Sequence, residues 1–284
     1  MTEAPLSSTD PMLAAAAVSA KFEEAETKFP DAPTLESDLV KLPGGLVRGE
    51  NVYRTAQVRE LTGEHEEKIY RALLSQNPAH IRSVILECGL VRIGDLNESE
   101  SRKLLPSLLI GDRDAIVLGI RNMTYDDSVD VSEWKCPECM EPMDLHLDLY
   151  EDIEVKKLTD PAKEVTFDVA LRKGGKAVVK LPTGADQLVV GESTDRTGAE
   201  RNSILLQQCV IEVDKPDGKG GEAKIMIAAM PGYVKSLGMK DRRTILEEIV
   251  KRQPGPQYQD IKITHDSCGK EVSLALDLVD LFLI

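Results

Sequence analysis

Four residues in two short segments have the types and spacing of metal ligands. Cys136 and Cys139 are separated by two residues, and so are His265 and Cys268 near the end of the chain. A structural zinc ion takes four such ligands in a tetrahedron. The sequence therefore predicts one Cys3His zinc site shared by two loops. A site closed by four protein ligands leaves no position for water or substrate, so its expected role is structural.

The two segments are versions of one another at a constant offset of 129 residues. This offset carries Cys136 onto His265 and Cys139 onto Cys268. Each pair of ligands is followed by leucines that alternate with other residues, and this period of two is typical of a β-strand. We therefore expect each pair at the tip of a β-hairpin. The offset carries Leu145, Leu147, Asp148 and Leu149 onto Leu274, Leu276, Asp277 and Leu278.

Shorter matches in the same order indicate an internal duplication. Thr62-Gly63 corresponds to Thr197-Gly198, and Cys88 corresponds to Cys209. The offset falls between these two matches, so we predict that the second copy has lost about one helix there. Further matches join Lys41-Leu42-Pro43-Gly44-Gly45 to Lys180-Leu181-Pro182-Thr183-Gly184, and Asp112, Arg113, Ile116 and Ile120 to Asp241, Arg242, Ile245 and Ile249.

The predicted architecture is an α+β fold of two related modules. Residues 1–36 form an N-terminal arm that is mobile or docked on a partner, because they are rich in Ala, Glu, Ser, Thr and Pro. Residues 37–155 form the first module, and residues 165–284 form a second, shortened copy. Each module contains β-hairpins and a few helices. A pseudo-twofold axis through the pair of zinc knuckles is expected to relate the two modules.

Local signals place the elements that must position the ligands in the first module. A strand from Val40 is expected to end in a turn at Gly44-Gly45, because glycine permits the positive φ of a tight turn. Helices are expected to begin at Thr62 and at Asn77-Pro78. A third helix, capped by residues 111–114, precedes the first ligand hairpin.

Composition excludes several classes of function. The chain has 284 residues and a net charge of −14, which opposes binding to phosphate backbones. No nucleic acid partner is therefore expected. No apolar run approaches the roughly 18 residues that would span a bilayer, so no membrane insertion is expected. The chain also lacks the Gly-x-Ser-x-Gly and His-Glu-x-x-His motifs of hydrolases, and we expect no enzymatic activity.

Other interpretations of the cysteines and histidines stay open at this point. Cys136 and Cys139 are vestigial thiols if the second segment has lost the metal, or a redox pair, although no helix N-terminus is expected beside them to stabilise a thiolate. Cys88 and Cys209 lie among aliphatic residues, which favours buried packing. His146 is out of phase with its leucine neighbours, so it should face solvent or a partner.

The ordered set of motifs resembles a known family. The motifs are the Leu-Pro-Gly-Gly segment, Leu61-Thr62-Gly63, residues 108–113, Cys136-Pro-Glu-Cys139 and the Leu-Asp-Leu strand. Together they resemble the T-even-type baseplate hub and tail assembly proteins of contractile-tailed bacteriophages. The resemblance covers residues 40–149 well and mainly the last third of the second module. The second knuckle departs from the pattern, with His265 in place of a cysteine and no proline.

The resemblance implies a structural component of a phage tail baseplate, in the hub or wedge region. Such a protein binds other tail proteins during and after assembly and is located in the virion, within a multi-subunit assembly. The main alternative is an assembly chaperone that is absent from the finished tail. A more distant alternative is a metal-dependent enzyme, which would need an open coordination position.

Overall fold

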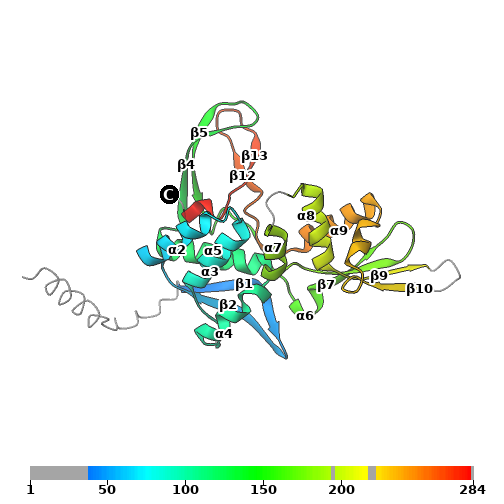
Figure 1. Ribbon diagram of the computed structural model, residues 1–284. Coiled ribbons are helices and arrows are strands. Elements are labelled where there is room, and N and C mark those ends of the chain that lie inside the picture. The colour runs from blue at the N-terminus through cyan, green and yellow to red at the C-terminus, as the bar shows by residue number, and fades with distance from the viewer. Residues whose placement is uncertain (1–37, 193–195, 217–221, 283–284) are drawn as a thin grey trace, which may run out of the picture. The chain divides into compact units, whose positions relative to one another are not determined.

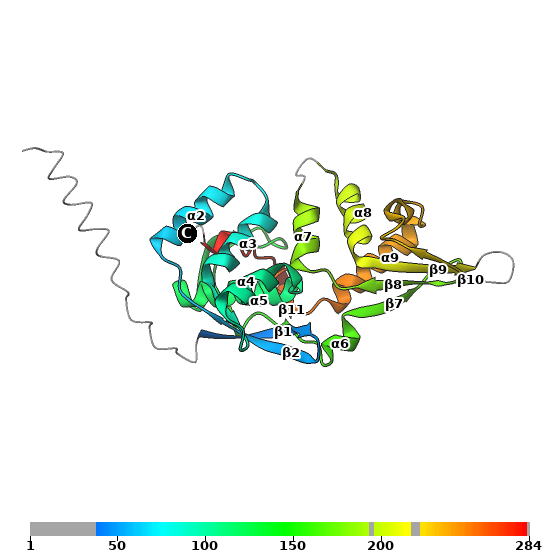
Figure 2. The ribbon, with the colours of Figure 1, turned by 60° about the horizontal axis from the view of Figure 1, so that its bottom comes forward.

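The first described elements form a three-stranded antiparallel sheet covered by helices (Figures 1 and 2). The structure is a computed structural model and describes residues 38–192, 196–216 and 222–282. Residues 36–284 make up one compact unit, and the predicted N-terminal arm lies outside the described residues. The sheet has the order β1-β2-β3. Its strands are β1 (Leu39–Arg48), β2 (Asn51–Val58) and β3 (Leu90–Ile93).

Four helices accompany this sheet, and two of them begin where capping signals predict. Thr62 is the N-cap of the first helix, and the Asn77 side chain accepts hydrogen bonds from the backbone N–H groups of Ala79 and His80. The last of the four packs across β1 and β2 (Figure 2). The helices are α2 (Gly63–Leu73), α3 (Pro78–Gly89), α4 (Glu98–Leu104) and α5 (Ile110–Thr124).

The turn predicted at Gly44-Gly45 lies elsewhere. The hairpin exists, but β1 continues to Arg48 and the chain turns at Gly49 and Glu50. Residues 42–45 instead form an irregular stretch inside β1, opposite a single residue of β2. The backbone N–H groups of Gly44 and Gly45 donate to Oδ1 of Asp112 at 2.6 and 3.3 Å. Asp112 was expected to help cap its own helix, and its carboxylate binds the neighbouring strand instead.

A second antiparallel sheet has the order β10-β9-β8-β7. Helices α8 and α9 pack against it. The elements of this region are β6 (Val155–Lys156), α6 (Pro161–Glu164), β7 (Thr166–Ala170), β8 (Lys176–Lys180), α7 (Gly184–Gly191), α8 (Gly198–Cys209), β9 (Val210–Pro216), β10 (Glu222–Met226), α9 (Met239–Arg252) and β11 (Gly255–Pro256).

Two helices, α2 and α3, lie between Thr62 and Cys88, and one helix, α8, lies between Thr197 and Cys209, but a further helix, α7, precedes Thr197. Helices α2 and α3 lie between β2 and β3, and helices α7 and α8 lie between β8 and β9 in the same order. The segment that resembles Leu-Pro-Gly-Gly is not a strand turn here, because Thr183 is the N-cap of α7. The backbone N–H of Thr183 donates to Oδ2 of Asp186 at 2.8 Å. The second half instead has β10 where the first has α4.

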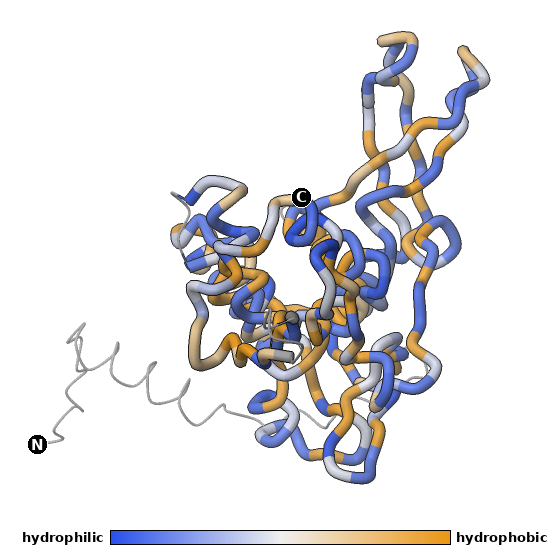
Figure 3. The backbone as a smooth tube through the Cα atoms, turned by 90° about the vertical axis from the view of Figure 1, so that its right-hand side faces the viewer, coloured by the Kyte–Doolittle hydropathy of each residue, from blue (hydrophilic) through white to orange (hydrophobic). Residues whose placement is uncertain are grey.

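Two hairpins extend side by side away from the helices (Figures 1 and 3). Apolar and polar residues alternate along their strands, as the sequence pattern predicts (Figure 3). The first hairpin pairs β4 (Ser128–Lys135) with β5 (Pro142–Asp148), and the second pairs β12 (Ile261–Thr264) with β13 (Glu271–Leu274).

The described residues contain two hydrophobic cores, and residues 278–282 contribute to the first. That core joins the first sheet, α3 and α5 to apolar residues of both hairpins. Leu278, Leu281 and Phe282 are buried in it. Nε of Arg121 on α5 donates to the carbonyl oxygen of Leu281 at 2.9 Å. The second core lies between the second sheet, α8 and α9.

Candidate metal centre

The two predicted ligand pairs occupy turns of the same backbone conformation. In the first hairpin, the N–H of Cys136 donates to the carbonyl oxygen of Glu141 at 3.1 Å, and the N–H of Met140 donates to the carbonyl oxygen of Cys136 at 2.9 Å. Residues at the offset of 129 make the same two bonds in the second hairpin. The N–H of His265 donates to Lys270 at 3.0 Å, and the N–H of Gly269 donates to His265 at 2.7 Å.

Both turns also contain one residue in the left-handed region of backbone conformation. Met140 has φ 63°, and Gly269, at the offset of 129, has φ 66°. Such values are rare for residues other than glycine. The glycine of the second turn adopts this conformation without strain. The similar backbones mean that each turn presents its two ligand side chains in the same way.

The structure brings the four predicted ligands together. One donor atom from each of Cys136, Cys139, His265 and Cys268 lies within 4.8 Å of all the others. The Sγ atoms of Cys136 and Cys268 are 4.0 Å apart. Nδ1 of His265 lies 3.2 Å from Sγ of Cys139 and 3.3 Å from Sγ of Cys268.

These separations fit tetrahedral coordination. Zinc bonds of about 2.3 Å to sulfur and about 2.0–2.1 Å to nitrogen place ligand atoms roughly 3.6–3.8 Å apart in a tetrahedron. The separations around Nδ1 of His265 are a few tenths of an ångström shorter, and the Cys136–Cys268 separation is slightly longer. Small rotations of the side chains would suffice to centre an ion. The cluster can therefore hold a metal ion such as zinc.

Hydrogen bonds within the cluster favour the thiolate form of Cys136. Cys136 and His265 are buried, whereas Cys139 and Cys268 are half-buried. Burial opposes ionisation of the Cys136 thiol, but hydrogen bonds from the backbone N–H groups of Cys139 and Glu138 and from the neighbouring thiols lower its pKa to about 7. A thiol with a pKa of about 7 is about half ionised at pH 7, and the thiolate is the form that binds a metal.

An ion pair beside the cluster connects the two turns, and the sequence reasoning missed it. Nζ of Lys270 on the second turn donates to Oε2 of Glu138 on the first. A zinc ion with three thiolates and a neutral imidazole would carry one net negative charge, and the neighbouring pair of Glu138 and Lys270 adds no net charge to it. The sequence did contain a signal for this pair, because Glu138 and Lys270 have opposite charges and lie within two residues of predicted ligands on the two turns.

Cys88, Cys209 and His146 lie where the sequence reasoning placed them. Cys88 and Cys209 are buried near the ends of α3 and α8. His146 is exposed, and its Nδ1 lies 2.7 Å from Oδ1 of Asp130. No helix begins at the Cys136 turn, which was the requirement for the redox interpretation. None of these residues joins the metal cluster.

The fold and the site define an α+β protein in which two β-hairpins share one Cys3His cluster at their tips. The chain belongs to the T4 bacteriophage base plate protein family, because the model of that family matches residues 40–283. This match confirms the family resemblance read from the motifs. Comparison with curated proteins gave no match, and neither did comparison with solved structures.

Family membership gives the chain a structural role in a phage baseplate. Proteins of this kind are generally not enzymes, and a baseplate protein associates with other tail proteins. In the part of the chain that the structure describes, no helix combines the length and apolar character needed to span a membrane.

Proposed function

We propose that this chain is a permanent component of the baseplate, in its hub or wedge region, and that it binds other tail proteins both during and after assembly. The family match carries this proposal. The closed donor set supports it, because four protein ligands leave a metal no position for catalysis. In this role the protein connects neighbours and has no substrate.

A single zinc ion bound by Cys136, Cys139, His265 and Cys268 joins the two hairpins. Each turn supplies only two ligands, so neither hairpin can close the coordination shell alone. The binding free energy of the metal therefore stabilises the pairing of segments that are 126 or more residues apart in sequence. This geometry makes the ion a clasp between the two halves of the chain.

The two halves, residues 37–155 and 165–284, are in this proposal copies of one module. Equivalent contacts at equivalent positions support the duplication. Nη2 of Arg113 on α5 donates to Oγ of Ser83 on α3 at 2.7 Å. Nη2 of Arg242 on α9 donates to Oγ of Ser203 on α8 at the same distance. Two modules of the same fold class need not share a specific side-chain contact, so the same arginine–serine hydrogen bond between corresponding helices supports a duplication.

The sheets carry further support for duplication. Between β2 and β3 the register skips one residue, Val91, and between β8 and β9 it skips one residue, Ile211. In both cases the skipped residue is the second of its strand, and the strand begins directly after a helix. A bulge conserved in place within a chain is expected from a common origin, since bulges are persistent features of families. Residues 1–36 are in this proposal an arm that contacts a partner.

Metal analysis of the purified full-length chain tests the clasp. We expect one zinc ion per chain, and loss of the ion when His265→Ala and Cys268→Ser are combined. Cys88→Ser is the matched control, because it also removes a cysteine thiol but lies outside the cluster. Unchanged zinc content in the double variant would rule out the shared site.

Quantitative mass spectrometry of purified particles tests the permanent role. The chain should be present in a fixed ratio to other baseplate proteins, and disassembly should place it with either the hub or the wedge fraction. Its absence from finished particles, together with its presence in assembly intermediates, would show instead that it is an assembly chaperone.

A further inference from the structure

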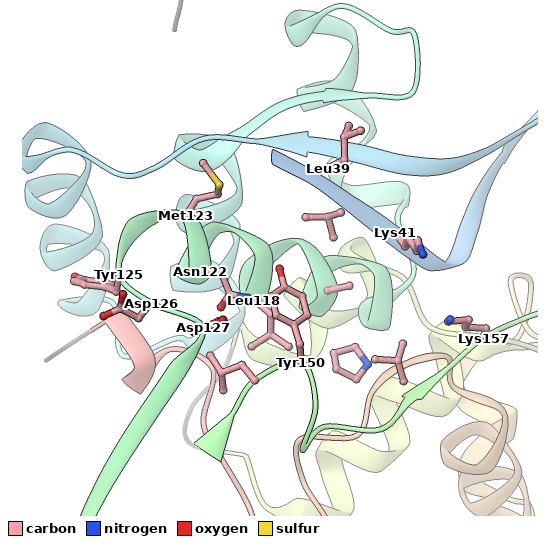
Figure 4. A pocket seen from close by; sticks show the side chains of 15 residues that line it. Leu39, Lys41, Leu118, Asn122, Met123, Tyr125, Asp126, Asp127, Tyr150 and Lys157 are labelled. Carbon is pink, nitrogen blue, oxygen red and sulfur yellow. The ribbon is translucent and has the colours of Figure 1, made fainter. Parts of the chain in front are cut away.

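A groove lies between the start of β1, helix α5 and β6 (Figure 4). It has a volume of about 710 Å³. Four of the large apolar side chains exposed on the described residues line it: Leu39 is 51% exposed, Tyr125 46%, Tyr150 57% and Val155 43%. Exposed apolar residues scattered singly are ordinary, but four around one hollow mark an interaction surface.

One wall of the groove is an edge strand with unused backbone groups. β1 is the outer strand of its sheet. Beyond Lys41, the N–H of Leu158 donates to the carbonyl oxygen of Pro43 at 2.8 Å, which closes that end of the groove. Among the described residues, the backbone of residues 39–41 makes no hydrogen bond on the side facing away from β2. An open edge of this kind is a template for adding another strand.

The two ends of the groove carry opposite charges. Figure 4 shows Lys41 and Lys157 at one end, Asp126 beside Tyr125 at the other, and Asp127 between Asp126 and Tyr150. None of these four charged side chains forms an ion pair within the described residues. Unpaired charges at both ends of an apolar groove favour an occupant whose two ends carry the complementary charges.

A buried amide on the groove wall also lacks partners. Asn122 of α5 lines the groove, and neither its Nδ2 nor its Oδ1 has a hydrogen-bond partner among the described residues. A carboxamide is both a donor and an acceptor, so after a small rotation it can bind the N–H and C=O groups of one peptide unit. Leaving both atoms unpaired costs free energy in the empty groove.

We propose that this groove binds an extended segment of another tail protein, which adds as a strand to the free edge of β1. The segment has alternating apolar side chains, a basic residue at the end that meets Asp126 and Asp127, and an acidic residue at the end that meets Lys41 and Lys157. Main-chain hydrogen bonds supply the affinity and the apolar wall selects the side chains. This inference rests on the proposed role as a protein that binds tail partners, and it identifies the surface used.

A peptide selection on the full-length chain tests the proposal. Random peptides of about twelve residues are selected for binding, and the recovered sequences are synthesised with neutral ends. We expect alternating apolar residues with opposite charges at the two ends. Making both ends acidic or both ends basic should weaken binding about tenfold. Bound peptide should also slow hydrogen exchange at residues 39–41.

Matched variants locate the binding site. Leu39→Asp places a charge in the apolar part of the groove and should weaken peptide binding about tenfold or more. Val52→Asp on β2 is the control, because Val52 is 41% exposed on a strand outside the groove, and it should leave affinity within about twofold. Circular dichroism and thermal unfolding of both variants confirm that each is folded.

Several results would overturn the inference. Selection that recovers no binder, or binders that are insensitive to Leu39→Asp, would remove the groove as a peptide site. Concentration-dependent dimerisation that Leu39→Asp abolishes would assign the groove to a second copy of this chain. A peptide of residues 1–36 that outcompetes the selected peptides would assign it to the chain itself. Each of these results is independent of whether the chain is found in finished particles.

Discussion

Replacing Asp112 by asparagine should change how the stability of the protein depends on pH. Asp112 lies in the first turn of α5 and its side chain is fully buried. Its Oδ1 accepts the N–H groups of Gly44 and Gly45, while its Oδ2 has no partner among the described residues. Asparagine has almost the same shape and retains an acceptor oxygen for these two donors, but it carries no charge.

The size of the effect follows from the pKa of the Asp112 carboxyl group. Burial raises this pKa from 3.8 to about 6, and the hydrogen bonds from Gly44 and Gly45 only partly oppose the increase. A carboxyl group whose pKa is higher in the folded chain favours folding below pH 3.8, and this stabilisation is lost as the pH rises through about 6. At about 1.36 kcal/mol per pKa unit, the loss is about 3 kcal/mol.

Urea denaturation at a series of pH values, followed by far-ultraviolet circular dichroism, measures the effect. The free energy of unfolding of Asp112→Asn minus that of the unchanged protein should rise by about 2.4 kcal/mol between pH 4 and pH 7, which is most of the full change. Taking this difference removes contributions from groups that titrate in the same way in both proteins. Asp241→Asn is the control, because Asp241 also lies in the first turn of its helix but is only half-buried.

If the difference in the free energy of unfolding between Asp112→Asn and the unchanged protein stays constant from pH 4 to pH 7, the raised pKa of Asp112 is refuted. This result would mean that the buried carboxylate of Asp112 is stabilised as well as it is in water. An equal rise in the free energy of unfolding of Asp241→Asn would also contradict the explanation by burial. The cause would then be the loss of a charge at a helix N-terminus, where the helix dipole acts.

Four further outcomes are expected. Gly111→Ala should destabilise the protein by about 3 kcal/mol or more, because its Cβ would lie 1.7 Å from the carbonyl oxygen of Pro254. In contrast, Gly63→Ala has open space and should raise the free energy of unfolding by about 0.5 kcal/mol in the same urea assay. Leu278→Ala should cost about 2–5 kcal/mol in thermal or urea unfolding, because Leu278 is fully buried in the first core. Bound zinc, measured by a chromophoric chelator, should be released on acidification because protons compete for the thiolate and imidazole ligands; retention at pH 4 would contradict this assignment.

Local signals predicted the elements well where the determining interactions are themselves local. Asn77 and Pro78 begin α3 because the capping amide and the fixed proline φ act within one turn. The alternating leucines predicted β5 for a similar reason, since strand faces alternate residue by residue. The ligand spacing likewise predicted both knuckle turns.

Predictions failed where a distant residue decides the local structure. Gly44 and Gly45 have the composition of a turn, yet the carboxylate of Asp112 binds their N–H groups from 68 and 67 residues away. Thr183 and Gly184 resemble that segment, yet they begin a helix. The match to this segment therefore predicted a strand turn where α7 begins.

The sequence by itself identified the four residues that could hold a metal and the turns on which they lie, because ligand chemistry and hairpin formation depend on side-chain type and short spacing. Only the tertiary structure decided that the two turns meet, with all four ligand atoms within 4.8 Å. It also decided that Leu278 and Phe282 are buried in the first core rather than the second. Contacts of this kind depend on burial between segments far apart in the chain, which no local pattern encodes.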